Sequence, residues 1–154
     1  MLFGKKKGKA RRGSPPPDAL DVPMHDIEQL VSLLARIQTE GAGGALVLVA
    51  NQEHNIYVQV AAISQQPDLW LEAVSNDFIS QDMQLSSAQQ QQLIDLGWSL
   101  PSAGQRQSQP NYVQEVQAHD DDTRRKAVEL LLLTLQQAYD IPGSTMLSVQ
   151  VIFN

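Results

Sequence analysis

The three histidines are the residues whose type best suits acid–base chemistry or metal binding. His25, His54 and His119 lie far apart along the chain, and no spacing brings any two of them together. A single imidazole without a fixed acidic or nucleophilic partner specifies little chemistry. We therefore interpret all three as surface or capping residues, against the alternative of catalysis or metal binding.

His119 is followed by Asp120, Asp121 and Asp122, and imidazole together with carboxylates can bind a divalent cation. Adjacent positions at the entry to a helix point in divergent directions, whereas metal ligands must converge. Aspartates at the start of a helix also cap its free N–H groups and carry a favourable charge. We predict a helix cap here and no metal site.

The other catalytic patterns are missing from the sequence. Gly41, Gly43 and Gly44 lack the lysine and the longer frame of a phosphate-binding loop, so they indicate a turn between a helix and a strand. No serine has a nucleophile-elbow setting. The chain has no cysteine, which excludes thiol catalysis and disulfides and favours a reducing compartment. We expect a cytoplasmic, non-enzymatic protein with no cofactor and no metal.

Hydrophobic periodicity predicts one α+β domain from residues 23 to 154, because 154 residues are too few for two ordinary domains. The expected order is α-β-β-β-α-(β)-α-β, an antiparallel meander packed by helices, with a short strand or extended loop as the bracketed element. The predicted elements are a helix from Pro23 to about 40, strands at 45–49, 56–62 and 69–75, a helix from Ser86 to Gly97, the segment 111–117, a helix from about 120 to 139 and a strand at 146–154.

Two tryptophans lie at informative positions. Gly97 can end the second helix in the left-handed conformation and direct Trp98 back as a lid on the core. Trp70 shares its strand phase with Glu72 and opposes Leu69 and Leu71. A tryptophan on the less apolar face is either covered by a helix or available to a partner, and both interpretations stay open.

The last helix has more leucines than one core requires. Ala127, Leu130, Leu131, Thr134, Leu135 and Ala138 form its core stripe. Leu132 and Leu133 lie off that stripe, and the strand that follows is at a chain end, where edge strands are common. We predict a homodimer through these surfaces, with burial under neighbouring helices or the polar loop 99–110 as the alternative.

The first 22 residues differ in composition from the rest of the chain. They begin with a basic segment and continue into a Pro-rich linker, placed at 13–22, so we predict a disordered tail. The remaining 142 residues after position 12 carry a net charge of −12. The basic residues of the tail are the candidates for weak contact with an anionic membrane or nucleic acid: Lys5, Lys6, Lys7, Lys9, Arg11 and Arg12. No apolar run is long enough to span a bilayer, and no signal peptide is evident.

Several short sequence motifs resemble those of the TY-Chap group, bacterial domains similar to type III secretion chaperones and to the YbjN proteins. They are Leu71-Glu72-Ala73-Val74-Ser75-Asn76 with Phe78-Ile79, Leu96-Gly97-Trp98 with Pro101, and Pro110-Asn111-Tyr112, within residues 27 to 140. The resemblance implies a type III secretion chaperone-like fold that binds peptides or protein segments. The basic tail and the strand at 146–154 are expected departures from the family.

The leading hypothesis is therefore a bacterial peptide-binding, chaperone-like adaptor that uses an exposed sheet face or edge for a protein client. A structural homodimer without a client is the first alternative, and a small enzyme is the second. The candidate partner-binding residues are Trp70, Phe78, Trp98, Tyr112, Leu132 and Leu133.

Overall fold

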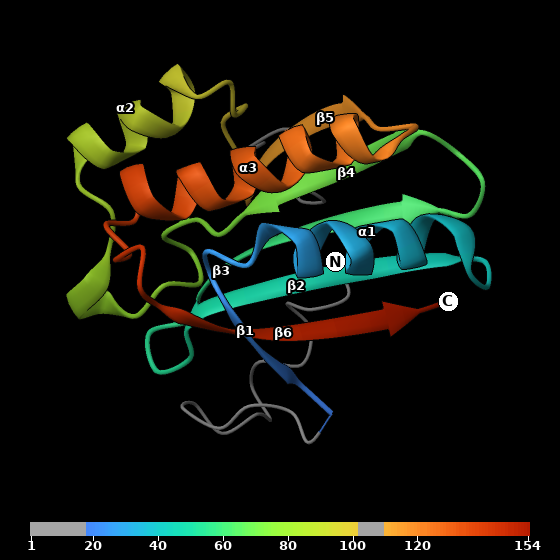
Figure 1. Cartoon of the computed structure of the whole chain (residues 1–154). Coiled ribbons are helices and arrows are strands. Elements are labelled where there is room, and N and C mark those ends of the chain that lie inside the picture. The colour runs from blue at the N-terminus through green and yellow to red at the C-terminus, as the bar shows by residue number, and fades with distance from the viewer. Residues whose placement is uncertain (1–17, 102–109) are drawn as a thin grey trace.

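The computed structural model describes residues 18–101 and 110–154. These residues form an antiparallel sheet with α-helices packed on it (Figure 1). In chain order the elements are β1 (Leu20–Pro23), α1 (Ile27–Thr39), β2 (Gly43–Asn51), β3 (Ile56–Ile63), β4 (Asp68–Ala73), the 3-10 helix η2 (Gln81–Met83), α2 (Ser87–Asp95), β5 (Tyr112–Gln117), α3 (Asp121–Gln137) and β6 (Met146–Phe153). The predicted α+β class and the predicted helices and strands are confirmed.

The sheet has six strands in the order β1-β6-β2-β3-β4-β5, and every neighbouring pair is antiparallel. β2, β3 and β4 form the predicted meander. β6 lies between β2 and β1, so the expectation that the last strand is an edge strand is wrong. The sequence hid this arrangement because β1 has only four residues, and the alternation of Leu20, Asp21 and Val22 is too short to predict a strand.

Strand β1 lies partly within the segment that the sequence indicated as linker. Leu20 pairs with Val149 and Val22 with Leu147, and the Val22 side chain is fully buried. Four residues cannot form a stable strand alone, so β1 depends on the neighbouring β6. The folded part of the chain therefore includes at least Leu20 to Val22. The six basic residues of the tail lie outside the described residues.

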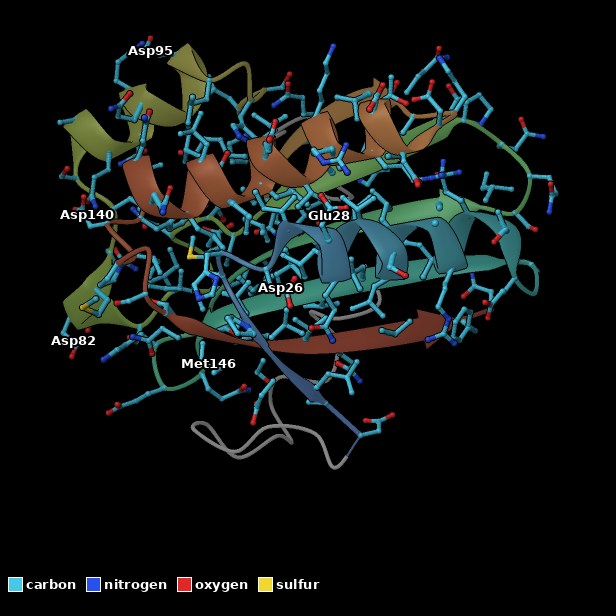
Figure 2. The ribbon with its side chains drawn as sticks, in the orientation of Figure 1. Asp26, Glu28, Asp82, Asp95, Asp140 and Met146 are labelled. Carbon is cyan, nitrogen blue, oxygen red and sulfur yellow. The ribbon has the colours of Figure 1, made fainter. Side chains whose placement is uncertain are left out.

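Helices α1 and α3 lie side by side on one face of the sheet, and α2 packs on α3 (Figure 1). α1 begins at Asp26, whose carboxylate accepts from the Gln29 N–H, and Glu28 follows on its first turn (Figure 2). Leu30, Leu34 and Ile37 bury its apolar stripe. No helix among the described residues is long and apolar enough to cross a membrane.

The predicted caps of the other helices are confirmed. Ser86 and Gln89 form a reciprocal capping box at the start of α2, and Gly97 ends that helix with a φ of 98°. Asp120 caps α3 by accepting from the Thr123 N–H at 2.9 Å. Gln89 also donates to Asp140 at 3.0 Å, which joins α2 to the end of α3 (Figure 2).

Candidate peptide-binding face

The two faces of the sheet can be assigned from contacts at its opposite ends. The Tyr112 hydroxyl on β5 lies 3.4 Å from Oε1 of Gln90 on α2. The Phe153 ring on β6 lies 5.1 Å below the guanidinium of Arg36 on α1. Alternate residues of a strand point to opposite faces, and residues paired across neighbouring strands point to the same face. Tyr112, Phe153 and the residues in phase with them therefore face the helices, and the residues between them along each strand face away.

We name the face away from the helices the open face. Its side chains are those of Asp21, Pro23, Ala45, Val47, Val49, Tyr57, Gln59, Ala61, Ile63, Asp68, Trp70, Glu72, Val113, Glu115, Gln117, Met146, Ser148, Gln150 and Ile152. None of the α-helices in residues 18–101 and 110–154 packs on this face (Figure 1).

The open face carries apolar and aromatic side chains beside polar ones, although the free face of an antiparallel sheet is usually polar. Val49 on β2 lies opposite Tyr57 on β3, and Val47 lies in the row of Gln59 and Glu72. Val47 and Tyr57 are 0% exposed. Ala61 and Trp70 continue the apolar surface toward β4 and are half-buried. The accessible part of this apolar surface, at Ala61 and Trp70, suits contact with another segment of polypeptide.

Glu72 is a buried carboxylate in the open face, with only 3% of its surface exposed. Its Oε2 accepts from the indole Nε1 of Trp70 at 2.9 Å, and its Oε1 accepts from Nδ2 of Asn111 at 3.3 Å. Asn111 also accepts from the Ser75 N–H at 2.9 Å and donates to the Tyr57 hydroxyl at 3.2 Å. Neutral donors therefore hold the Glu72 charge in place.

The environment of Tyr57 reflects this network. Burial raises its pKa to about 12, the hydrogen bond from Asn111 lowers it, and the charge of Glu72 raises it. The phenol is neutral throughout the physiological range and remains a hydrogen-bonding group. The hydroxyl of Ser148, on the same face, is buried and has no hydrogen-bond partner among the described residues.

The structure separates the six predicted partner-binding residues. Only Trp70 lies on the open face, in the strand phase shared with Glu72 that the sequence predicted, and no described helix covers it. Trp98 is the predicted lid: it is buried, and its indole donates to the Thr134 hydroxyl at 3.0 Å. Tyr112 is buried on the helix side, and Phe78 is half-buried against the edge of the core.

The two surplus leucines of α3 differ in exposure. Leu132 is 7% exposed and belongs to the hydrophobic core, whereas Leu133 is 38% exposed. Packing of α2 on α3 widens the core-facing side of α3 beyond a single stripe. The interpretation of Leu132 as exposed surface is wrong, and Leu133 is the remaining candidate for self-association on this helix.

Sequence reasoning did not identify Tyr57, Asn111 or any carboxylate as part of the site. By strand alternation, the side chains of Tyr57, Trp70 and Glu72 all point to the open face. This common direction is the signal in the sequence that could have grouped them. Asn111 gives no such signal, because it precedes its strand and reaches the site only through the fold.

One histidine has nucleophilic and acidic neighbours that the sequence did not bring together. Nδ1 of His54 lies 2.6 Å from the Ser80 hydroxyl and 3.5 Å from Oδ1 of Asp82. A relay that activates a serine uses both ring nitrogens, one for the serine and the other for the carboxylate. Here both groups approach the same nitrogen, so the cluster lacks that geometry and instead links the β2–β3 turn to η2.

The Asp120 carboxylate forms the predicted helix cap, in which its Oδ1 accepts hydrogen bonds from the N–H and the hydroxyl of Thr123. A carboxylate held in this way does not turn toward other side chains to form a metal site. These hydrogen bonds from Thr123 also lower the pKa of Asp120. Within the described residues no group of three or more histidine, aspartate or glutamate side chains could hold a metal ion. His119 is exposed and hydrogen-bonds to Thr123 through its backbone N–H.

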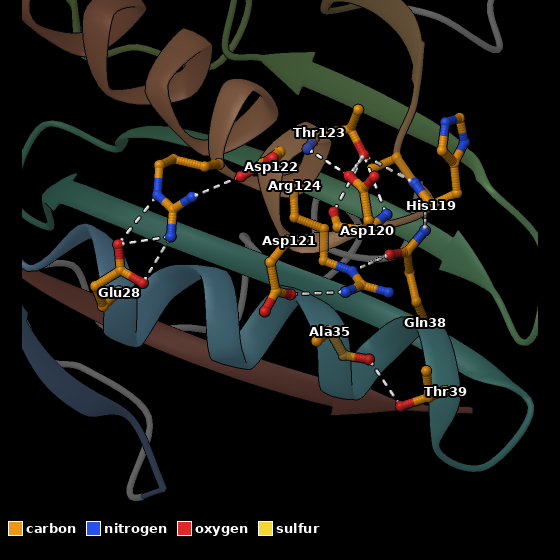
Figure 3. Close-up of polar contacts among 12 residues, drawn as sticks. Glu28, Ala35, Gln38, Thr39, His119, Asp120, Asp121, Asp122, Thr123 and Arg124 are labelled. Carbon is orange, nitrogen blue, oxygen red and sulfur yellow. Dashed lines mark hydrogen bonds and ion pairs between the residues drawn. The ribbon is translucent and has the colours of Figure 1, made fainter.

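A polar joint lies between α1 and α3 (Figure 3). Gln38, near the end of α1, donates to the carbonyl oxygens of Gln66 and Ala118 and accepts from Nε of Arg124 at 2.7 Å. A shallow cavity of about 230 Å³ borders Gln38, His119 and Arg124. All hydrogen-bonding atoms of the Gln38 amide have protein partners, so this joint stabilises the helix layer.

An antiparallel sheet with helices on one side and no helix on the other defines an α+β domain with one uncovered sheet face. Residues 28–152 match the model of the TY-Chap3 family, described as T3SS (YopN, CesT) and YbjN peptide-binding chaperone 3, and the chain belongs to this family. The predicted resemblance to the TY-Chap group is thus confirmed. Comparison with curated proteins and with solved structures gives no match.

The extent of the family match corrects one expectation. The sequence suggested that the strand at 146–154 departs from the family, but the match continues to Ile152 and includes most of β6. Strand β1 and the basic tail precede the matched residues. The tail is therefore outside the part of the chain that the family defines.

Proposed function

We propose that this chain is a cytoplasmic, non-enzymatic, chaperone-like adaptor whose open face receives an extended segment of a protein client. The observation that carries the proposal is the helix-free surface at Ala61 and Trp70, which are only half-buried. Membership of a family described as peptide-binding chaperones supports the same class of partner.

The chemistry of the open face indicates how a client segment would bind. Trp70 offers a large flat surface with little conformational freedom, and such residues contribute much of the binding energy in interfaces. Alternate side chains of an extended peptide would lie against the apolar rows of the sheet. The hydrogen bond from Trp70 to Glu72 fixes the orientation of the indole before the client arrives, which reduces the entropy lost on binding.

The experiment is selection of binding peptides from a random display library, followed by titration of the selected peptides against variants of the full chain. Trp70→Ala should weaken binding by a factor of about 10 or more, as expected for an aromatic hot spot. The matched control is Leu133→Ala, which removes a half-exposed apolar side chain from the helix side. Binding lost in Leu133→Ala and retained in Trp70→Ala would place the site on the helices and contradict the proposal.

A structural homodimer is the second candidate function, and the exposed Leu133 on α3 favours it. In that case the chain would retain only copies of itself and no selected peptide. We also propose that the basic tail contacts an anionic surface through its six cations.

A further inference from the structure

The two sides of the sheet differ in their basic residues. The open face has four carboxylates, those of Asp21, Asp68, Glu72 and Glu115, and no lysine or arginine among the described residues. Within 18–101 and 110–154, every lysine and arginine belongs to α1 or α3, on the helix side of the sheet. They are Arg36, Arg124, Arg125 and Lys126. The open face therefore attracts a cationic segment.

Glu72 gives this attraction a defined position. Its carboxylate is buried, and the side chains that donate to it within the described part of the chain, Trp70 and Asn111, are both neutral. A buried charge is stabilised far better by an opposite charge than by neutral donors alone. The indole of Trp70 beside the carboxylate adds a surface on which an ammonium or guanidinium group binds favourably. Together they suit the side chain of a lysine or an arginine.

The chain itself contains a segment with this chemistry. Six of its eleven basic residues lie between positions 5 and 12, and no acidic residue precedes Asp18. Leu2 and Phe3 add apolar side chains at the start of the same segment. Residues 1–17 lie outside the described residues. Only their composition and the position of Asp18, to which they are attached, are used below.

The point of attachment places the segment within reach. Asp18 leads directly into β1, and Glu72 lies on β4, four neighbouring strands away in the sheet order. At about 4.8 Å between strands, this separation is about 19 Å. Arg12 precedes Asp18 by six residues, which span about 20 Å when extended, and Lys5 has more than twice that length.

We propose that the basic segment from Lys5 to Arg12 binds the open face of its own chain, with one cationic side chain at Glu72. This inference rests on the proposed function, since the segment then occupies the surface assigned to the client and competes with it. A tethered segment acts at an effective concentration of roughly millimolar, so a weak contact weakens client binding roughly tenfold. The anionic surface proposed above as the contact of the tail is thus the open face of the same chain.

A spin label can test this contact in the full chain without any client. The chain has no cysteine, so Gly8→Cys provides one site for a nitroxide label. Nuclear magnetic resonance then measures the paramagnetic broadening of each backbone amide. We expect broadening around Ala61, Trp70 and Val113, with much less on α1 and α3. In about 1 M salt, where charges are screened beyond about 3 Å, the broadening should fall severalfold.

Two carboxylate variants and one matched control identify the contact. Glu72→Gln should reduce the broadening, and so should the double variant Asp68→Asn with Glu115→Gln, whose side chains are exposed. Asn at position 68 keeps an oxygen that can accept the hydrogen bond from Gln117. The control, Glu129→Gln, removes the same single charge from the exposed side of α3 and should change nothing. Broadening that is uniform, that lies on the helices, or that survives loss of the open-face carboxylates would overturn the proposal.

A second measurement separates this inference from the proposed function. Replacement of all six basic residues of the tail by glutamine should strengthen the binding of selected peptides roughly tenfold. Arg106→Gln is the control for the other undescribed segment and should leave peptide affinity unchanged. A stronger effect of Arg106→Gln than of the six replacements would overturn the assignment to the tail. Failure to find any binding peptide would contradict the proposed function but leave the spin-label result intact.

Discussion

Nδ2 of Asn111 lies 3.2 Å from the hydroxyl oxygen of Tyr57, a residue 54 positions earlier in the chain and two strands away in the sheet. The same amide donates to Glu72, and its oxygen accepts from the Ser75 N–H. One side chain thus satisfies three buried groups from β3, β4 and the segment that follows β4.

Asn111→Ala should lower the free energy of unfolding by about 2 to 4 kcal/mol, because it leaves a buried N–H and a buried carboxylate oxygen without a partner. Urea denaturation of the full chain measures the change. Gln91→Ala, which removes an exposed amide that bonds only to Asp95 on α2, should cost less than about 0.5 kcal/mol. Equal losses in the two variants would show that the Asn111 network does not stabilise the fold.

The three tyrosines should titrate late in the folded protein. Burial raises the pKa of Tyr57 to about 12 and also raises the pKa values of Tyr112 and Tyr139. Ultraviolet absorbance should show less phenolate in the native protein near pH 10 than in the unfolded chain. In Asn111→Ala the pKa of Tyr57 should rise further, because the hydrogen bond that lowers it is lost. A native chain that forms as much phenolate at pH 10 as the unfolded chain would contradict this prediction.

The same raised pKa values predict how stability depends on pH. A tyrosine with a raised pKa keeps its proton in the folded state after the unfolded state has lost it. Stability is therefore complete below about pH 10 and falls as the pH rises toward 12. A tenfold difference in proton affinity between the folded and unfolded states corresponds to about 1.4 kcal/mol of stability. Denaturant midpoints across this range should fall less steeply in Tyr57→Phe than in the wild-type chain.

Gln38→Leu should destabilise the helix layer by about 2 to 4 kcal/mol, since it leaves Nε of Arg124 and two carbonyl oxygens without their partner. The matched control is Arg36→Met, which breaks an exposed i,i+4 pair with Glu40 and the contact of the guanidinium with the Phe153 ring. It should change stability by about 1 kcal/mol or less. Thermal unfolding of the two variants gives the comparison. A larger loss for Arg36→Met would mean that the joint in Figure 3 contributes little.

Self-association is tested by sedimentation of the full chain at micromolar concentration. If the exposed Leu133 lies in a dimer interface, the wild-type chain sediments as a dimer and Leu133→Asp as a folded monomer. Ile63→Asp introduces the same charge at a more exposed position on β3 and should not alter the mass. A monomeric wild-type chain would remove the homodimer hypothesis.

The candidate site shows where prediction from the sequence ended. Strand alternation placed Trp70 with Glu72 on the less apolar face, because the side-chain period of a strand is fixed by backbone geometry. The sequence left open whether a helix covers that face. It also grouped Trp98 and Tyr112 with the partner residues, although both are buried on the helix side. Their type suited an interface, but the direction of a side chain depends on which face the helices cover.

The sequence by itself determined the α+β class, the meander of β2 to β4, the caps at Ser86, Asp120 and Gly97, and the family. These features follow from local backbone preferences and from periodicity, which act within a few residues. The tertiary structure alone decided that β1 pairs outside β6, that Leu132 is buried, and that Asn111 reaches Tyr57 and Glu72. Such contacts join residues far apart in the chain, and their free energy exists only after the whole sheet has formed.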